Sequence, residues 1–282
     1  MKGRAVNKLT AFLFWSTFSL CLNAQISLGP TVSSFGVLAG STVTNSGPTV
    51  VTGNLGVSPG TAITGFTGIA PGGPGIVVGT IHSADAFAAQ AQSELTAAYN
   101  AAAGAASTAT KNGDLGGQTL FRGVYTASSS LGITGTVTLD AQGDPNAQFI
   151  FQIGSALTTA TSSVVRLTNG AQPGNVFWQI GSSATLGTSS SFSGNILALS
   201  SISLGTGAVL QGRALARNGA VTLLSNTINA AIGPGGGGGG PGGGGGPPAT
   251  PAPPTLILVT TALICAGIYQ IRERLLKAFR RN

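Results

Sequence analysis

Charged residues are scarce in this chain, and their scarcity excludes several classes of partner. Only 7% of the 282 residues are charged, and the net charge of +7 comes from the two ends. Three basic residues precede residue 10 and five follow residue 271, so the middle region is neutral and lacks the basic patch of a nucleic-acid-binding protein. The charged residues of that middle region are Lys111, Arg122, Arg166, Arg213, Arg217, Asp85, Glu94, Asp114, Asp140 and Asp144.

Histidine and cysteine are almost absent, which excludes the usual catalytic and disulfide chemistry. The chain has one histidine, His82, and two cysteines, which lie near opposite ends. A hydrolase needs a nucleophile, a base and an orienting group. His82 with Asp85 fits a capping or packing pair better than a catalytic dyad. Asp140 and Asp144 could bind calcium weakly, but a Pro-containing turn explains them more simply. We therefore expect no enzyme activity, no cofactor, no metal and no disulfide in the middle region.

The N-terminal end has the pattern of an export signal. Residues 1–24 combine basic residues, an apolar run and a small residue, Ala24, at the expected cleavage site. This pattern predicts a secretory signal peptide that is cleaved after Ala24. Lipid attachment at Cys21 is an alternative, but Leu20 stands where such a site needs a small residue.

The C-terminal end has the pattern of a membrane anchor. Residues 233–254 are mostly Gly and Pro and predict a flexible linker. Residues 255–271 are almost wholly apolar and are followed by the basic segment 272–282, which predicts a transmembrane helix with a cytoplasmic tail. We expect the mature protein to be a monomer that is exported to the cell surface and held in the membrane by its C-terminal helix.

Between these ends, residues 25–232 carry a degenerate repeat typical of a β-solenoid. Four segments open with an apolar strand, turn, and continue with a Ser/Thr/Ala strand: FIFQIGSALTTA, VFWQIGSSATLG, ILALSSISLG and ALARNGAVTLL. Their starts at Phe149, Val176, Ile196 and Ala214 are spaced like turns of a solenoid. A third strand with Gly or Asn at the corners closes each turn, which predicts a mainly β, roughly triangular β-helix.

One segment, about 83–103, breaks the strand pattern and predicts a long α-helix. It is rich in Ala, Gln, Leu and Glu, with Ser83 as a candidate N-cap and Gly104 at the C-terminal end. The apolar strands have apolar residues on both sides of the pleat, so they need cover on both sides. We expect the helix to lie along these strands and to leave the Ser/Thr/Ala strands facing water.

The exposed strands then present a flat, uncharged face. Alternation places Ile202, Leu204, Val221 and Leu223 inward, with Ala184 and Leu186 by alignment. The candidate contact residues are Thr42, Thr44, Thr61, Thr64, Thr158, Ser183, Thr185, Ser201, Ser203, Ala220 and Thr222. A rigid array of hydroxyl and methyl groups without charge suits a ligand that offers neither charge nor a pocket.

Several long strings in order, among them FGVLAGSTVTNSGPTVVTGNLGVSPGTAITGF, GTIHSADAFAAQAQSELTAAYN and NVFWQIGSSATLG, resemble the secreted microbial ice-binding-like family. The resemblance covers essentially the whole of residues 25–232. It implies a discontinuous right-handed β-helix with a long helix packed alongside and an ice crystal surface as the ligand. Thr61-Ala62-Ile63-Thr64 resembles a short element of some active members. The alternative function is a structural or adhesive surface solenoid that binds polysaccharide or other cells.

Overall fold

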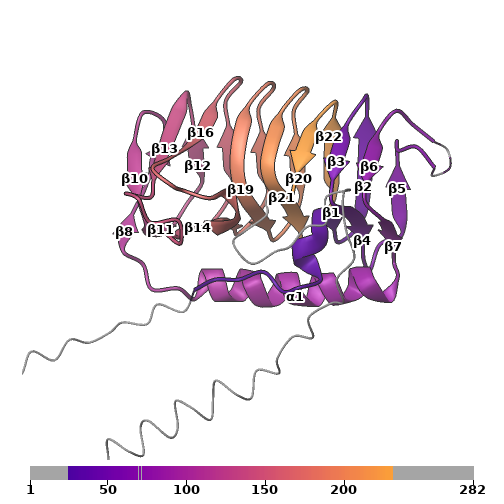
Figure 1. Ribbon diagram of the computed structural model, residues 1–282, viewed down its shortest axis with the longest axis horizontal. Coiled ribbons are helices and arrows are strands. Elements are labelled where there is room, and N and C mark those ends of the chain that lie inside the picture. The colour runs from indigo at the N-terminus through magenta and orange to yellow at the C-terminus, as the bar shows by residue number, and fades with distance from the viewer. Residues whose placement is uncertain (1–24, 69, 71, 231–282) are drawn as a thin grey trace, which may run out of the picture. The chain divides into compact units, whose positions relative to one another are not determined.

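The computed structural model describes residues 25–230 apart from residues 69 and 71. These residues form a solenoid of parallel strands with three strands to a turn and one α-helix beside it (Figure 1). The predicted signal peptide, linker, anchor and basic tail lie outside the described residues. Within the described residues, no helix is both long and apolar enough to cross a membrane.

The solenoid has three faces. One face is an eight-stranded sheet whose strands, in spatial order, are β5 (Ala62–Thr64), β2 (Thr42–Ser46), β22 (Val221–Leu224), β20 (Ile202–Leu204), β18 (Ala184–Leu186), β15 (Leu157–Thr159), β12 (Leu131–Ile133) and β9 (Gly113–Asp114). We call its outer surface the hydroxyl face. The other two faces belong to one fifteen-stranded sheet, because β19 (Ser191–Ala198) and β21 (Val209–Ala216) run across both.

The helix-covered face consists of the second halves of β19 and β21 with β1 (Phe35–Ala39), β4 (Asn54–Val57), β7 (Ile81–Ser83), β8 (Ala109–Thr110), β11 (Gly123–Ala127), β14 (Phe149–Ile153) and β17 (Val176–Ile180). The third face consists of the first halves of β19 and β21 with β3 (Val50–Thr52), β6 (Ile76–Val78), β10 (Thr119–Phe121), β13 (Thr136–Asp140), β16 (Val164–Thr168) and β23 (Thr227–Asn229). The two long strands turn the corner at Gly194 and Gly212, which pair in register and have φ angles of +119° and +155°.

The order of coils in space differs from their order in the chain. The first coil stacks on the last one, because Val37 pairs with Ala214 and Thr44 pairs with Thr222. In Figure 1, the first strands of the described region, β1 to β3, lie directly beside β20 to β22, which are among its last strands. The β-helix is therefore discontinuous, as the family resemblance implied. The starts at Val176 and Ile196 are 20 residues apart, but the coil itself spans 18 residues, because Ile196 pairs with Trp178.

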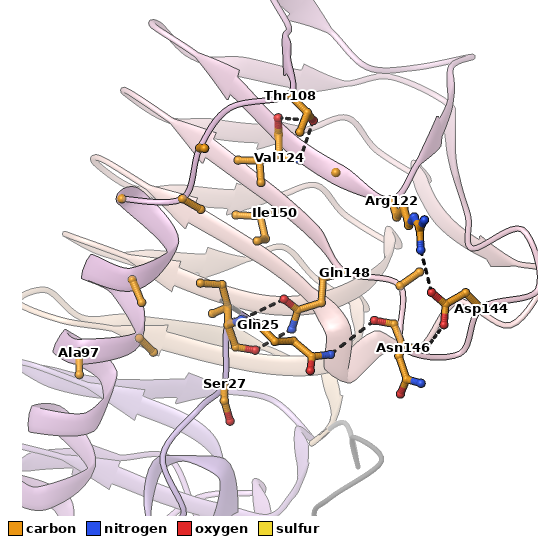
Figure 2. Close-up of a pocket in the computed structure, with 18 of the residues that line it drawn as sticks. Gln25, Ser27, Ala97, Thr108, Arg122, Val124, Asp144, Asn146, Gln148 and Ile150 are labelled. Atoms are coloured by element: carbon orange, nitrogen blue, oxygen red, sulfur yellow. Dashed lines mark hydrogen bonds and ion pairs between the residues drawn. The ribbon is translucent and has the colours of Figure 1, made fainter. Parts of the chain in front are cut away.

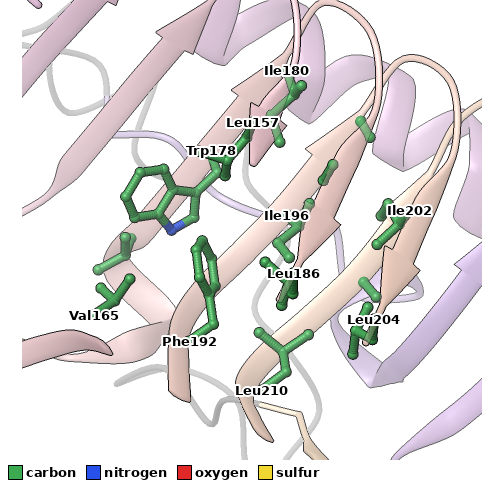
Figure 3. Close-up of a cluster of buried hydrophobic side chains, with 14 of the residues drawn as sticks. Leu157, Val165, Trp178, Ile180, Leu186, Phe192, Ile196, Ile202, Leu204 and Leu210 are labelled. Atoms are coloured by element: carbon green, nitrogen blue, oxygen red, sulfur yellow. The ribbon is translucent and has the colours of Figure 1, made fainter. Parts of the chain in front are cut away.

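The core lies inside the triangle and is filled by inward side chains from all three faces. The ring of Trp178 stacks on that of Phe151 at a centroid distance of 3.8 Å and lies 5.0 Å from that of Phe192. Leu157 and Leu186, from the strands of the hydroxyl face, reach the same cluster (Figure 3). The strands that carry the hydroxyl face are thus supported from behind by a close-packed interior.

The α-helix α1 (Ala86–Ala103) lies along the helix-covered face, as predicted. Its N-cap is Asp85, whose side chain accepts a hydrogen bond from the Ala88 N–H, whereas Ser83 ends β7 instead of capping the helix. Its buried side includes Ala91 and Leu95. That side packs against outward residues of the solenoid: Leu38, Ile150, Phe177, Leu197 and Leu215.

A segment at the N-terminal end of the described region, residues 26–34, is held between the helix and the solenoid. The segment ends in the 3-10 helix η1 (Val32–Ser34). The other 3-10 helix of the described region, η2 (Pro173–Asn175), lies elsewhere and precedes β17. Arg213, which is only 6% exposed, donates to the carbonyl of Ser33 at 3.0 and 2.7 Å, and burial lowers the pKa of Arg213 to about 10. From the helix, Glu94 accepts the N–H groups of Thr31 and Val32 at 2.8 and 2.9 Å.

The contacts of Glu94 make stability depend on pH. Burial alone would raise the pKa of Glu94, but hydrogen bonds from Val32, Gln90 and Thr31 outweigh it and hold the pKa below its usual value. Because the folded pKa is depressed, the stabilisation is fully present above the unfolded pKa and is lost as pH falls through the folded pKa. In urea unfolding at a series of pH values from about 6 to 3, the free energy of unfolding should therefore fall less steeply in Glu94→Gln than in the wild type. Equal slopes would contradict this role.

Candidate functional site

The hydroxyl face contains one unbroken row of outward residues. The strand register pairs Thr64 with Thr44, Thr44 with Thr222, and Thr222 with Ser203. It then pairs Ser203 with Thr185 and Thr185 with Thr158. Six of the predicted contact residues therefore stand in line on six neighbouring strands, about 4.8 Å apart.

A second line runs parallel to this row, two residues earlier on each strand. Thr42 pairs with Ala62, and both lie beside the first row on β2 and β5. On the next strands the corresponding predicted residues are Ala220, Ser201 and Ser183, and the carbonyls of all three accept ladder hydrogen bonds from the adjacent coil. Thr61 does not belong to either line, since it precedes β5 and its carbonyl accepts a hydrogen bond from Ser83.

The row continues beyond the residues predicted from sequence. Gly132 pairs with Thr158, and Asp114 pairs with Gly132, so the last two positions carry no methyl or hydroxyl group. Asp114 is the one charged residue in the row. Hydrogen bonds from Thr134 and from the Gly116 N–H hold its pKa below the usual value despite some burial. Sequence analysis missed Gly132 and Asp114 because only Thr, Ser and Ala positions were considered, and only the strand register places these two residues in the row.

The hydroxyl face is rigid and has no aromatic platform. Residues between the outward positions, such as Ile202 and Val221, are fully buried, so each strand is fixed by the core. The large apolar residues that are exposed in the described region all lie on other elements: Ile76, Val78, Phe87 and Phe121. The face can therefore make many small contacts in register, but it offers neither a pocket nor a ring for stacking.

The other candidate groups from the sequence have structural partners. His82 Nδ1 lies 2.7 Å from Asp85 Oδ2, and the His82 ring stacks on Phe87 at 4.6 Å, which is a packing arrangement at the helix start. Asp140 and Asp144 each accept a backbone N–H two residues ahead, as turn residues do. Within the described residues, no group of three or more His, Cys, Asp or Glu side chains is placed to bind a metal ion.

An open cleft of about 1260 Å³ lies between α1, the N-terminal segment and the loop before β14. Its floor is formed by small helix residues and by Val124 and Ile150, and its rim carries Gln25, Arg122 and Asp144. Figure 2 shows these polar residues joined around the rim through the backbone of Asn146.

Fold and site together define a class of protein: a parallel β-solenoid with a covering helix and one flat, nearly uncharged open face. A profile of the ice-binding-like family matches residues 37–229, and the chain belongs to this family. The ice-binding protein of Nostoc sp. strain HG1 is 56% identical over 210 residues, which are 74% of this chain and 76% of that protein. The ice-binding protein of Colwellia sp. is 38% identical over 211 residues, which are 70% of this chain and 80% of that protein.

Solved structures agree with the family assignment. The crystal structure of an ice-binding protein from an Antarctic biological consortium has a TM-score of 0.70 at 50% identity, over 74% of this chain and 92% of the solved chain. The ice-binding protein of Antarctomyces psychrotrophicus has a TM-score of 0.69 at 42% identity, over 73% and 98% of the two chains. The mainly β solenoid fold with one covering helix is thus the fold of the family.

Proposed function

We propose that this protein binds ice through the hydroxyl face. The observation that carries the proposal is the row of six hydroxyl residues in continuous register on six parallel strands. The relatives described as ice-binding proteins support it. The chain is proposed to act on ice as a non-enzymatic binder, as an antifreeze or as an inhibitor of recrystallisation.

The proposed contact depends on preorganisation. Water at an ice surface is already ordered, so a ligand gains most when its own groups are fixed before they meet it. Thr side chains in β-strands have few χ1 rotamers, and their methyl and hydroxyl groups repeat at the strand spacing. Charged groups would hold their own hydration shell, and the row contains one charge, at its end.

Uptake into growing ice tests this proposal. Fluorescently labelled protein spanning residues 25–232 is expected to enter the ice fraction when a dilute solution is frozen slowly, because bound molecules are overgrown, whereas a non-binding protein is rejected into the liquid. The measurement is the ratio of fluorescence in ice to that in liquid, with serum albumin as the rejected control. Rejection of the protein while its circular dichroism shows folded β-structure would refute ice binding.

We further propose that the protein is exported and held at the cell surface. Residues 1–24 would be removed on export, residues 233–254 would form a linker, residues 255–271 would anchor the chain in the membrane, and residues 272–282 would lie in the cytoplasm. The solenoid would then act as a monomer that attaches the cell to ice or limits ice growth beside it. Protease added to intact cells should release the solenoid while leaving the anchor with the membrane fraction.

A further inference from the structure

Polar functional groups are concentrated at one corner of the solenoid, where the third face meets the helix-covered face. Four of the ten charged residues of the described region gather here: Arg122, Asp140, Asp144 and Arg166. Phe121 belongs to the same corner, and its side chain is 46% exposed. We call these five residues the polar corner.

The register of three neighbouring strands places these side chains side by side. Phe121 on β10 pairs with Asp140 on β13, and Asp140 pairs with Thr168 on β16. All three lie on the outer surface, because the preceding residues, Leu120 and Leu139, are buried. Arg166 stands two positions before Thr168 on the same side of β16. The exposed ring of Phe121 thus has the carboxylate of Asp140 as its neighbour on the next strand, and the two strands are about 4.8 Å apart.

The carboxylates of the corner are held in fixed orientations. Asp140 Oδ1 accepts the Gln142 N–H at 2.8 Å and the Asn169 side-chain amide at 2.9 Å. Asp144 Oδ1 accepts the Asn146 N–H at 2.9 Å, while its Oδ2 pairs with Arg122 at 3.0 Å. In each case the turn uses Oδ1, which leaves Oδ2 of Asp140 for a ligand, whereas Oδ2 of Asp144 already contacts Arg122.

Charge and shape select the kind of ligand. The two guanidinium and two carboxylate groups cancel, so the corner offers no net attraction to a polyanion or a polycation. An exposed aromatic ring packs against the C–H face of a sugar, while carboxylates accept from sugar hydroxyls and guanidinium groups donate to them. The hydroxyl face lacks such a ring, so the two surfaces are suited to different ligands.

The cleft extends the polar corner. Arg122 and Asp144 belong to both, and the far rim carries the side-chain amides of Gln25 and Gln148 (Figure 2). The Gln148 amide is fixed by two hydrogen bonds to the backbone of Ile26, at 2.9 and 2.6 Å. A chain of several sugar units that starts on Phe121 can therefore continue past the ion pair along a preformed groove with an apolar floor and a polar rim.

We propose that the polar corner and the adjoining cleft form a second binding site, whose ligand is a neutral polysaccharide. Phe121 stacks on one sugar ring, and Arg122, Asp140 and Asp144 hydrogen-bond to its hydroxyls. The site is separate from the hydroxyl face, so the protein can hold a glycan surface and an ice surface at the same time.

Affinity electrophoresis tests the proposal. The purified full chain is run in native gels with and without dextran, laminarin or hydroxyethyl cellulose, and migration is compared at increasing polysaccharide concentration. At least one of the three should retard the wild type. Phe121→Ala should raise the apparent Kd about tenfold or more, since it removes the stacking surface. Arg122→Gln, at a side chain that is 66% exposed, should weaken retardation without affecting the fold.

The matched control is Phe87→Ala, which removes a ring of similar exposure, 41%, at the start of α1. Its retardation should equal that of the wild type, and uptake into ice should be unchanged in Phe121→Ala and Arg122→Gln. Absence of retardation in all three gels, or equal retardation of the wild type and both corner variants, would overturn the proposal. Neither result would affect ice binding by the hydroxyl face, which is measured separately.

Discussion

Replacing Thr185 with tyrosine should abolish uptake of the protein into ice while changing the free energy of unfolding by no more than about 0.5 kcal/mol. Thr185 is exposed in the interior of the row, between Thr158 and Ser203. A phenol ring there stands above its neighbours and holds a flat crystal surface away from them. Because the scaffold is rigid, the remaining residues cannot move outward to restore contact. Ice partitioning and urea unfolding of the same preparation measure the two effects.

The third face supplies the matched control for this substitution. Thr227 is also an exposed strand residue, paired with Val209 and Val50, so Thr227→Tyr adds the same bulk to a different sheet. Uptake into ice should be retained in Thr227→Tyr. The opposite result, with uptake lost in Thr227→Tyr and kept in Thr185→Tyr, would place the ice contact on the third face.

Alternation alone was sufficient to predict the inside and outside of the hydroxyl face. Ile202, Leu204, Val221 and Leu223 are fully buried, as their positions between Ser and Thr residues predicted. The covering helix was predictable for a related reason: strands that are apolar on both sides, such as Phe149–Ile153, need cover on both sides. Both inferences rest on local periodicity, which a single sequence contains.

The sequence did not predict the contacts between residues that are far apart in the chain. The stacking of β2 on β22 joins residues that are far apart in the chain, and no spacing within either strand indicates the partner. The role of Arg213 was missed for the same reason, because its acceptor, the carbonyl of Ser33, is 180 residues away. The continuation of β19 across two faces was likewise not predicted, because the bend at Gly194 leaves no mark in the local hydrophobic pattern.

The polar corner was also hidden from sequence analysis. Asp140 and Asp144 were interpreted as turn residues, and the structure confirms that each accepts a backbone N–H in a turn. Their second feature, the position of Asp140 beside Phe121, depends on strand register and not on spacing along the chain. In the proposed glycan site, Asp140 would therefore act both as a turn residue and as a binding residue.

The largest loss of stability is expected from truncating Trp178. This side chain is fully buried, its ring stacks on Phe151 with planes 7° apart, and its Nε1 donates to the carbonyl of Ser193 at 3.0 Å. Trp178→Ala should lower the free energy of unfolding by about 3–5 kcal/mol, through lost burial and the cavity that remains. That is a large share of the roughly 5–15 kcal/mol that stabilises a typical domain. Urea unfolding of wild type and variant provides the measurement.

Trp178→Phe separates packing from hydrogen bonding at the same site. It keeps a ring on Phe151 but leaves the buried Ser193 carbonyl without its donor, so it should cost about 1–3 kcal/mol, less than the alanine variant. Because Leu157 and Leu186 of the hydroxyl-face strands share this cluster, loosening it also loosens the row in front of them. Ice uptake by Trp178→Ala, measured near 0 °C where the chain is still folded, should therefore fall below wild type but remain above that of Thr185→Tyr. Uptake equal to that of the wild type would show that the row keeps its flatness without this part of the core.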